Sequence, residues 1–141
     1  MNSTTSRMPE MLRELRAREN QMVRLLGNFV RCESPSHDKA AVDRMAGILA
    51  AEWKRRGTQV RVLPQRNRGD HLRVEVWHGK GRPAGQILVL GHMDTVYPLG
   101  TIASMPFRVS GGRAYGPGTF DMKGGLDRKS TRLNSSHGII S

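Results

Sequence analysis

The chain has 141 residues and a formal net charge of +11, with 23 Lys and Arg against 12 Asp and Glu. This length suffices for one modest domain with its own core. No run of 18 apolar residues and no apolar stretch at the N-terminus occurs, so neither a membrane span nor a secretory signal is indicated.

The basic charge raises the question of nucleic-acid binding. The Lys and Arg residues are scattered along the chain, and aromatic residues make up only 5%, too few for an obvious stacking platform. The single cysteine, Cys32, excludes an internal disulfide and fits a reducing compartment. We therefore expect a cytoplasmic protein with neither a nucleic-acid nor a membrane partner, and solvated basic faces as the meaning of the charge.

The first half of the chain is predicted to be helical. Residues 1–7 are interpreted as a flexible leader, and apolar residues at helical spacing predict a helix from Pro9 that ends before Ser34-Pro35-Ser36. A second helix is predicted from about Asp38 to Arg56, started by Ser36 or Asp38 and ended by Gly57.

Three strands are predicted next, at 59–63, 72–77 and 86–90. The first two alternate apolar and polar residues, whereas the third, Ile87-Leu88-Val89-Leu90, is a continuous apolar run typical of a strand buried on both faces. This pattern predicts a mixed sheet with the third strand in its interior. Together with the helices it predicts an α/β fold.

Candidate functional residues follow the third strand. His92 and Asp94 point the same way while the chain stays extended, and Asp121 follows 29 positions after His92, behind the turn Gly116-Pro117-Gly118. Imidazole and carboxylate groups delivered by two loops at a strand end suit zinc. Asp94 is placed to orient the ring of His92. Asp121 as a helix N-cap is the structural alternative.

Other candidate residues have more ordinary interpretations. Cys32 is expected to be a buried small side chain rather than a nucleophile. The histidines His37, His71 and His78 are expected to be local, solvated residues rather than metal ligands.

The two motifs G-H-x-D-T-V and Y-G-P-G-x-x-D-M-K-G-G closely resemble those of the zinc-dependent exopeptidase and deacylase family. That family includes glutamate carboxypeptidase, acetylornithine deacetylase and succinyl-diaminopimelate desuccinylase. The resemblance covers roughly residues 10–126 and implies the N-terminal part of a mixed-sheet catalytic domain with flanking helices. Tyr97 and the wording around it are closer to the glutamate carboxypeptidase-like members.

The resemblance also implies roles for the candidate residues. The match of His92 binds one metal, that of Asp121 bridges two metals, and that of Asp94 holds the histidine ligand. The cofactor is then Zn²⁺, two per complete site, with Co²⁺ or Mn²⁺ as alternatives. A non-proline cis peptide is implied before Met122. The substrate would be a peptide or an N-acyl amino acid, and the full-length form would be a homodimer.

Parts of the family's site are missing from this sequence. The general base of the family is a Glu in a downstream Glu-Glu pair, whereas no Glu follows Glu75 here. Residues 127–141 lack any hydrophobic period and resemble the translation of a sequencing adapter, so we expect a non-native tail after an N-terminal portion at 8–126. The leading hypothesis is therefore a fragment of a two-zinc carboxypeptidase-type hydrolase, inactive by itself. The alternative is a non-catalytic, metal-binding remnant of the same fold.

Overall fold

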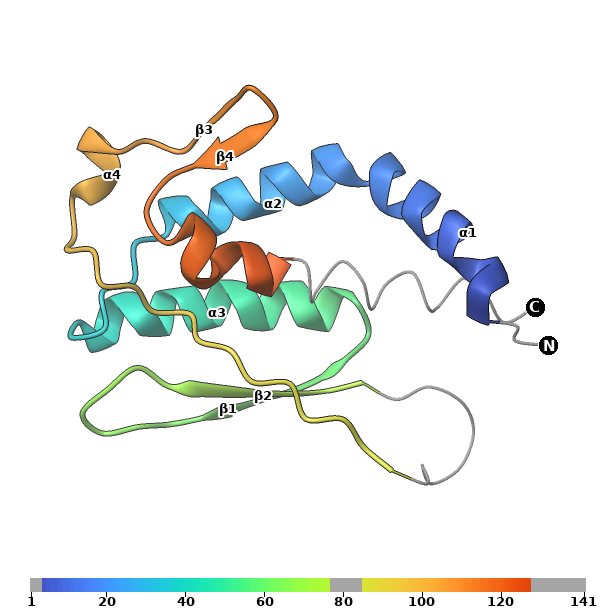
Figure 1. Cartoon of the computed structure of the whole chain (residues 1–141). Helices are drawn as coiled ribbons and strands as arrows, with labels where there is room; N and C mark the ends of the chain where they lie inside the picture. The colour runs from blue at the N-terminus through green and yellow to red at the C-terminus, as the bar shows by residue number, and fades with distance from the viewer. Residues whose placement is uncertain (1–3, 77–84, 128–141) are drawn as a thin grey trace.

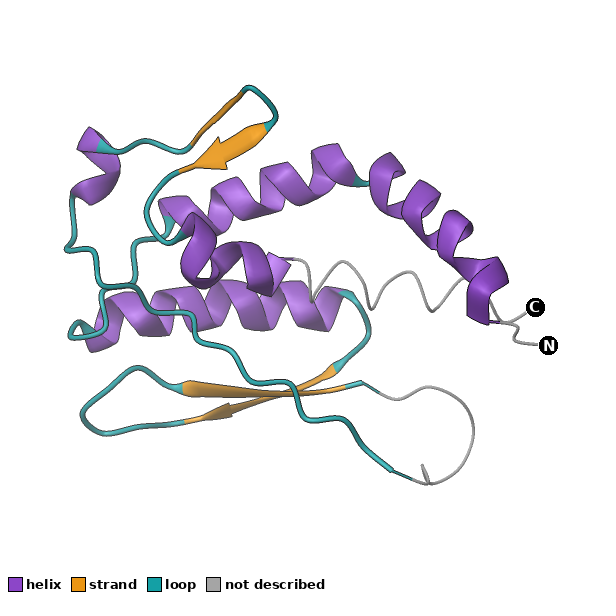
Figure 2. Ribbon diagram, viewed as in Figure 1, coloured by secondary structure: helices purple, strands orange, loops and turns teal. Residues whose placement is uncertain are grey.

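The computed structural model describes residues 4–76 and 85–127, and its elements stack in layers (Figures 1 and 2). Helices α2 and α3 run side by side in opposite directions, and a β-hairpin covers α3 on the side away from α2. The described part of the chain contains no helix long and apolar enough to cross a membrane. The α/β class expected from the sequence is confirmed.

The first predicted helix is present as two helices, α1 (Thr4–Ala17) and α2 (Glu19–Arg31). Arg18 separates them with φ −100° and ψ 1°, and α1 diverges from α2 at this point in Figure 1. No Pro or Gly marks the break, which explains why the hydrophobic period did not show it. The helix also begins before Pro9, so residues 4–7 are helical rather than part of a leader; Pro9 only removes one backbone donor inside α1.

Helix α3 (Lys39–Arg55) follows the sequence prediction closely. Asp38 is its N-cap, and its carboxylate accepts a hydrogen bond from the backbone N–H of Ala41 at 2.9 Å. The left-handed Gly57, with φ 74°, follows the last turn, as a C-terminal glycine does in many helices.

Strands β1 (Gln59–Leu63) and β2 (His71–Glu75) form an antiparallel hairpin in which Arg61 pairs with Arg73. The bounds of β1 are those predicted. β2 begins one residue earlier than predicted, and Trp77 lies outside the described residues.

The third predicted strand is wrong in this structure. Residues 86–90 belong to no strand, and their apolar side chains are exposed, with Ile87 92% and Leu88 78% accessible. The described residues form two antiparallel two-stranded sheets rather than one mixed sheet. An apolar run becomes an interior strand only where strands flank it and layers cover it, and sequence pattern alone does not supply those neighbours.

The core lies between the helices and reaches the loop that follows this run. Phe29 of α2 packs with Met45 and Leu49 of α3. Partly buried residues pack against this cluster, among them Trp53 of α3 itself and, from three further segments, Leu72 of β2, Met93 and Leu126. The core therefore touches the chain directly beside His92 and close to Asp121.

The remaining elements are short and precede or contain Asp121. They are α4 (Thr101–Ser104), the hairpin of β3 (Arg108–Ser110) and β4 (Arg113–Tyr115), and the turn η1 (Thr119–Lys123). Residues 124–127 continue from η1 as one helical turn. This turn and η1 lie between α2 and α3 in the view of Figure 1, and η1 contacts α2.

Candidate metal-binding site

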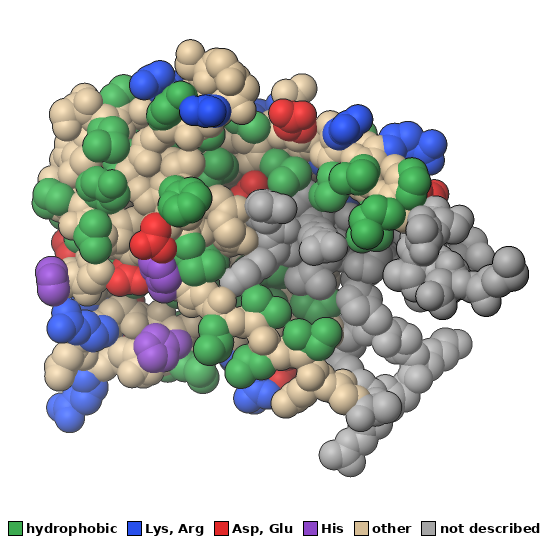
Figure 3. All heavy atoms as spheres, viewed as in Figure 1, with side chains coloured by type: hydrophobic (Ala, Val, Ile, Leu, Met, Phe, Trp, Pro, Cys, Tyr) green, Lys and Arg blue, Asp and Glu red, His purple; other side chains and the backbone are tan. Residues whose placement is uncertain are grey.

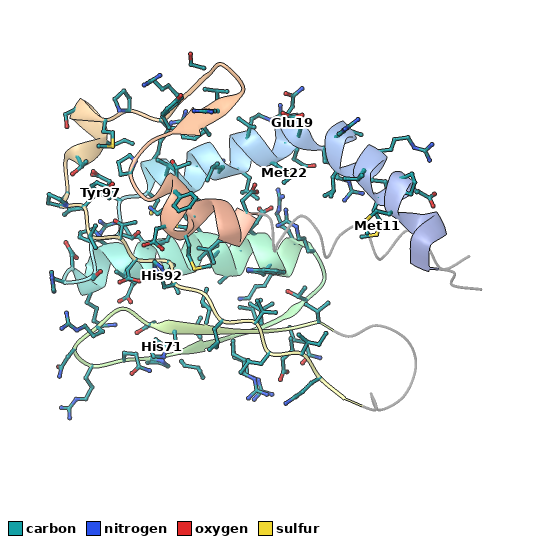
Figure 4. All side chains as sticks on the ribbon, in the orientation of Figure 1. Met11, Glu19, Met22, His71, His92 and Tyr97 are labelled. Carbon is teal, nitrogen blue, oxygen red and sulfur yellow. The ribbon has the colours of Figure 1, made fainter. Side chains whose placement is uncertain are left out.

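Two loops form the site, residues 91–95 and the turn η1. The first loop lies against residues 34–36, where Thr95 N–H donates to Ser34 O at 2.8 Å and Ser36 N–H donates to Thr95 O at 3.0 Å. This pairing is a single parallel bridge between Pro35 and Thr95. It places the loop at the C-terminal end of α2, in front of α3, where Figure 4 labels His92.

The structure brings the three sequence-predicted site residues together. His92 Nε2 lies 2.9 Å from Asp121 Oδ1, and His92 Nδ1 lies 3.1 Å from Asp94 O and 3.4 Å from Asp94 Oδ1. Both ring nitrogens therefore face acceptors, one from each loop. The backbone N–H of His92 also contacts Met122 Sδ at 3.3 Å, which ties the loops together a second time.

The protonation of His92 reflects these partners. Partial burial disfavours the imidazolium form, but the hydrogen bonds with Asp121 and Asp94 outweigh that cost, so the pKa of His92 is raised above its ordinary value. The His92 side chain is 45% exposed and that of Asp121 78%. Solvent therefore reaches the site, and Figure 3 shows histidine and acidic side chains meeting on the drawn face.

Local backbone geometry aims Asp121 at His92. Asp121 has φ −121° and ψ 96°, which are not helical values, although it lies within η1. Gly118, with φ 69°, occupies the N-cap position of η1, and the Asp121 carboxylate contacts His92 instead. The peptide bond between Asp121 and Met122 is cis, as the resemblance implied.

Close approach of two backbones also brings the loops together. A Cβ on Gly118 would lie 2.5 Å from Cγ2 of Thr95, which is far inside van der Waals contact. Only glycine allows η1 to lie this close to the loop of His92.

Sequence reasoning missed a buried lysine beside the site. Lys123 is 1% exposed, and its Nζ donates to Phe29 O at 2.9 Å and to Cys32 O at 2.7 Å, at the end of α2. Desolvation lowers the pKa of Lys123 to about 8. In the sequence, a lysine beside two glycines looks like a solvated residue, and only its partners reveal its burial.

Sequence reasoning also missed the roles of Glu33 and Ser34. The Ser34 hydroxyl, fully buried, donates to Met93 O at 2.8 Å. The Glu33 carboxylate accepts hydrogen bonds from the backbone N–H groups of Gly100 at 2.8 Å and Ile102 at 2.9 Å. From the sequence pattern, only a helix end is predicted in this segment. The polar side chains of Glu33 and Ser34 are the signal that could have indicated hydrogen bonds to other segments.

The remaining histidines are not part of this pair of loops, and Cys32 contacts η1 through its backbone carbonyl, which accepts from Lys123. His71 opens β2 (Figure 4), His37 contacts Arg68 on the surface, and His78 is outside the described residues. Cys32 is half-buried, and burial raises the pKa of its thiol, which opposes nucleophilic reactivity.

The donor types at the site suit zinc, but they make only part of a ligand set. An imidazole nitrogen and a carboxylate oxygen converge from two loops, whereas zinc usually takes four ligands. In the ranges 4–76 and 85–127, no group of three or more His, Cys, Asp and Glu residues could hold a metal ion. An open hollow beside the site is lined by residues that include Tyr97, Arg108 and Tyr115.

Comparisons with known proteins give a family match and a curated relative for this chain. Residues 88–126 match the family described as Peptidase family M20/M25/M40. Carboxypeptidase G2 from Pseudomonas sp. (strain RS-16) is 36% identical over 106 residues, an alignment that covers 74% of this chain. The chain spans about a quarter of the length of that relative, 25%.

Proposed function

Because residues 88–126 match the model of peptidase family M20/M25/M40, we propose that this chain is part of a metal-dependent hydrolase that cleaves a peptide or amide bond. The observation that supports the proposal best is the 2.9 Å approach of His92 Nε2 to Asp121 Oδ1 across two loops. An imidazole and a carboxylate that converge from two loops supply two of the donor types that zinc takes in proteins.

His92 and Asp121 would be metal ligands, and Asp121 would bridge two zinc ions, since a carboxylate has two oxygens to offer. Bound zinc supplies a polarised substrate carbonyl and a water molecule of lowered pKa. Asp94 acts on the opposite side of the ring: its backbone and carboxylate oxygens hold the proton on His92 Nδ1. Nε2, which contacts Asp121 in this structure, would then exchange its proton for a metal ion.

A general base is needed to complete the reaction, and we place it outside this chain. No Glu follows Glu75 in the sequence, while the family resemblance assigns the base to a downstream Glu. We therefore expect hydrolysis from a longer protein that contains this chain and none from the 141 residues alone.

The substrate class we propose is a peptide or N-acyl amino acid with a free carboxylate. The name of Carboxypeptidase G2 supports release of a C-terminal residue. Arg108 lines the hollow beside His92 and lies 4.2 Å from the ring centroid of Tyr115, so a guanidinium is held where a substrate carboxylate would be attracted. A homodimer of the longer protein is a further part of this proposal.

The alternative function is metal binding without catalysis. It is favoured by the two-donor site and by the lack of a Glu after Glu75. Restoring the reading frame to full length and measuring hydrolysis of N-acyl glutamate before and after chelation separates the two functions. Chelator-sensitive hydrolysis supports the enzyme, whereas zinc binding without hydrolysis supports the alternative.

Zinc titration of the ¹⁵N-labelled chain tests the ligands directly. We expect the Nε2 resonance of His92 to shift on binding, and the shift to be lost in His92→Ala and strongly weakened in Asp121→Ala. His71→Ala is the matched control, because His71 lies on the β2 strand away from the site. Unchanged zinc affinity in Asp121→Ala would show that the carboxylate is not a ligand.

A further inference from the structure

The end of α2 contacts both loops of the candidate site, although it contributes no ligand. Residues 29–36 interact with residues 93–95 on one side and with Lys123 on the other. Two loops that are far apart in the sequence are thus bound to one stretch of the chain, the end of α2 and the residues that directly follow it. The side chains of Ser34 and Lys123 make these contacts.

Ser34 holds the first loop. Its hydroxyl is fully buried and donates to Met93 O, the carbonyl between His92 and Asp94, at 2.8 Å. The backbone of Ser34 also accepts from Thr95 at 2.8 Å. The backbone is therefore held at Met93, between the two site residues, and at Thr95, directly after them.

Lys123 holds the second loop, two residues after Asp121. Its ammonium reaches 94 residues back to Phe29 O and 91 back to Cys32 O, both at the C-terminal end of α2. Carbonyls at this end of a helix carry partial negative charge and attract cations. Lys123 is buried, so its ammonium is bonded to these carbonyls rather than to water. These hydrogen bonds hold η1 against the end of α2.

We propose that Ser34 and Lys123 are positioning residues that hold His92 and Asp121 at the separation metal binding requires. The inference rests on the proposed metal site and adds to it the residues that set its geometry. Neither side chain touches the candidate ligands; each fixes the backbone that carries one. Without them, the two loops would have to be ordered when metal binds, at a cost in affinity.

The test uses the ¹⁵N-labelled chain with Lys123→Met, which keeps the length of the side chain but removes its ammonium. Zinc is titrated while the Nε2 resonance of His92 is followed, and far-UV circular dichroism checks the fold. We expect an apparent dissociation constant about tenfold higher. Lys39→Met is the matched control: Lys39 also has two partners, Asp43 and Asp70, but they lie away from the site, so we expect a change below about twofold.

A metal-free measurement accompanies the titration. The nuclear Overhauser contact between the His92 amide and the Met122 methyl group reports the approach of the loops. It should weaken in Lys123→Met and persist in Lys39→Met. If Lys123→Met does not fold, Ser34→Ala is measured in its place. We expect it to bind zinc more weakly and to show a weaker Overhauser contact.

The two proposals fail in different ways. The positioning role alone would be overturned if a folded Lys123→Met kept both its zinc affinity and its Overhauser contact. The same result in Ser34→Ala would overturn it where Lys123→Met does not fold. No zinc-dependent shift of His92 in the unsubstituted chain would overturn the proposed metal site. A weakened Overhauser contact together with weakened zinc binding supports both.

Discussion

Glu33 is a single carboxylate that organises the segment after the first site loop. It accepts the backbone N–H groups of Gly100 and Ile102, at the start of α4, and these hydrogen bonds lower its pKa. A lowered pKa in the folded state means that the stabilisation is present above the unfolded pKa, about 4.3, and is lost as pH falls through the folded value.

We expect Glu33→Gln to lower the melting temperature more at neutral pH than in acid, because the glutamine lacks the charge that strengthens both hydrogen bonds. The difference between the two proteins should shrink as pH falls from about 7 to about 3. Thermal melts over this range provide the measurement, with Glu10→Gln on the exposed face of α1 as the control. A difference that stays constant with pH would mean that the charge of Glu33 contributes nothing.

At the residue scale, the sequence predicted three residues that lie together in the structure but not all of their partners. The positions of His92 and Asp94 directly after an apolar run, and the resemblance around Asp121, were the signals. The contact between His92 and Asp121 joins positions 29 apart, and no local period encodes such a distance. Lys123 and Ser34 were missed because burial of a polar side chain depends on partners about 60 to 90 residues away.

At the scale of elements, the junction between η1 and the His92 loop depends on Gly118. An alanine there would need a left-handed φ of 69° and would place its Cβ 2.5 Å from Thr95. The left-handed conformation alone costs about 1–2 kcal/mol for an L-residue. We expect Gly118→Ala to lower the free energy of unfolding by at least about this amount and to weaken zinc binding; urea unfolding and zinc titration measure the two effects.

Gly47 offers the matched control for this substitution. It lies inside α3, its φ is not positive, and a Cβ added there would have no atom within 4 Å. Gly47→Ala should therefore stabilise the chain by about 0.5–1 kcal/mol through helix propensity. A Gly118→Ala protein as stable as Gly47→Ala would show that the close approach of the two loops is not needed.

Elements with local signals were predicted well, and those that depend on neighbours were not. Asp38 and Gly57 predicted the two ends of α3, and the alternation of apolar and polar residues predicted β1. Helix caps and strand periods depend only on residues that are close in the sequence. The break at Arg18 has no such signal, because no Pro or Gly marks it. The apolar run at 87–90 has the composition of an interior strand, but composition does not supply the strands that would have to flank it.

At the scale of the whole molecule, that apolar run is the most exposed hydrophobic stretch of the described residues. Four consecutive side chains, from Ile87 to Leu90, are each more than half accessible. Exposed, extended, β-prone segments of this kind favour association. We expect the chain to self-associate at raised concentration and the double variant Leu88→Lys, Leu90→Lys to stay monomeric under the same conditions.

Sedimentation velocity over a range of protein concentrations measures this association. The control is Leu12→Lys on α1, an exposed apolar position outside the run. It adds charge without touching the run, so it should associate as the parent does. Equal association of the parent and the double variant would exclude residues 87–90 as the contact.

The overall class was predictable from the sequence, whereas the arrangement of the sheet was not. Helical and strand periods succeed one another along the chain and fix an α/β composition. A mixed sheet would need long-range pairing with residues 86–90, whereas the described strands pair only with their neighbours in the sequence, in two separate hairpins. The packing of α2 on η1 depends on Phe29, Leu126 and Lys123, which no window of adjacent residues brings together.

The tie between Lys123 and the end of α2 also sets an order of events during synthesis. Phe29 leaves the ribosome 94 residues before Lys123, a delay of roughly 5 to 20 seconds at typical elongation rates. Once α3 (Lys39–Arg55) has also been synthesised, α2 and α3 can pack while the carbonyls at the end of α2 are still solvated. The loops of the site therefore close onto helices that have already formed.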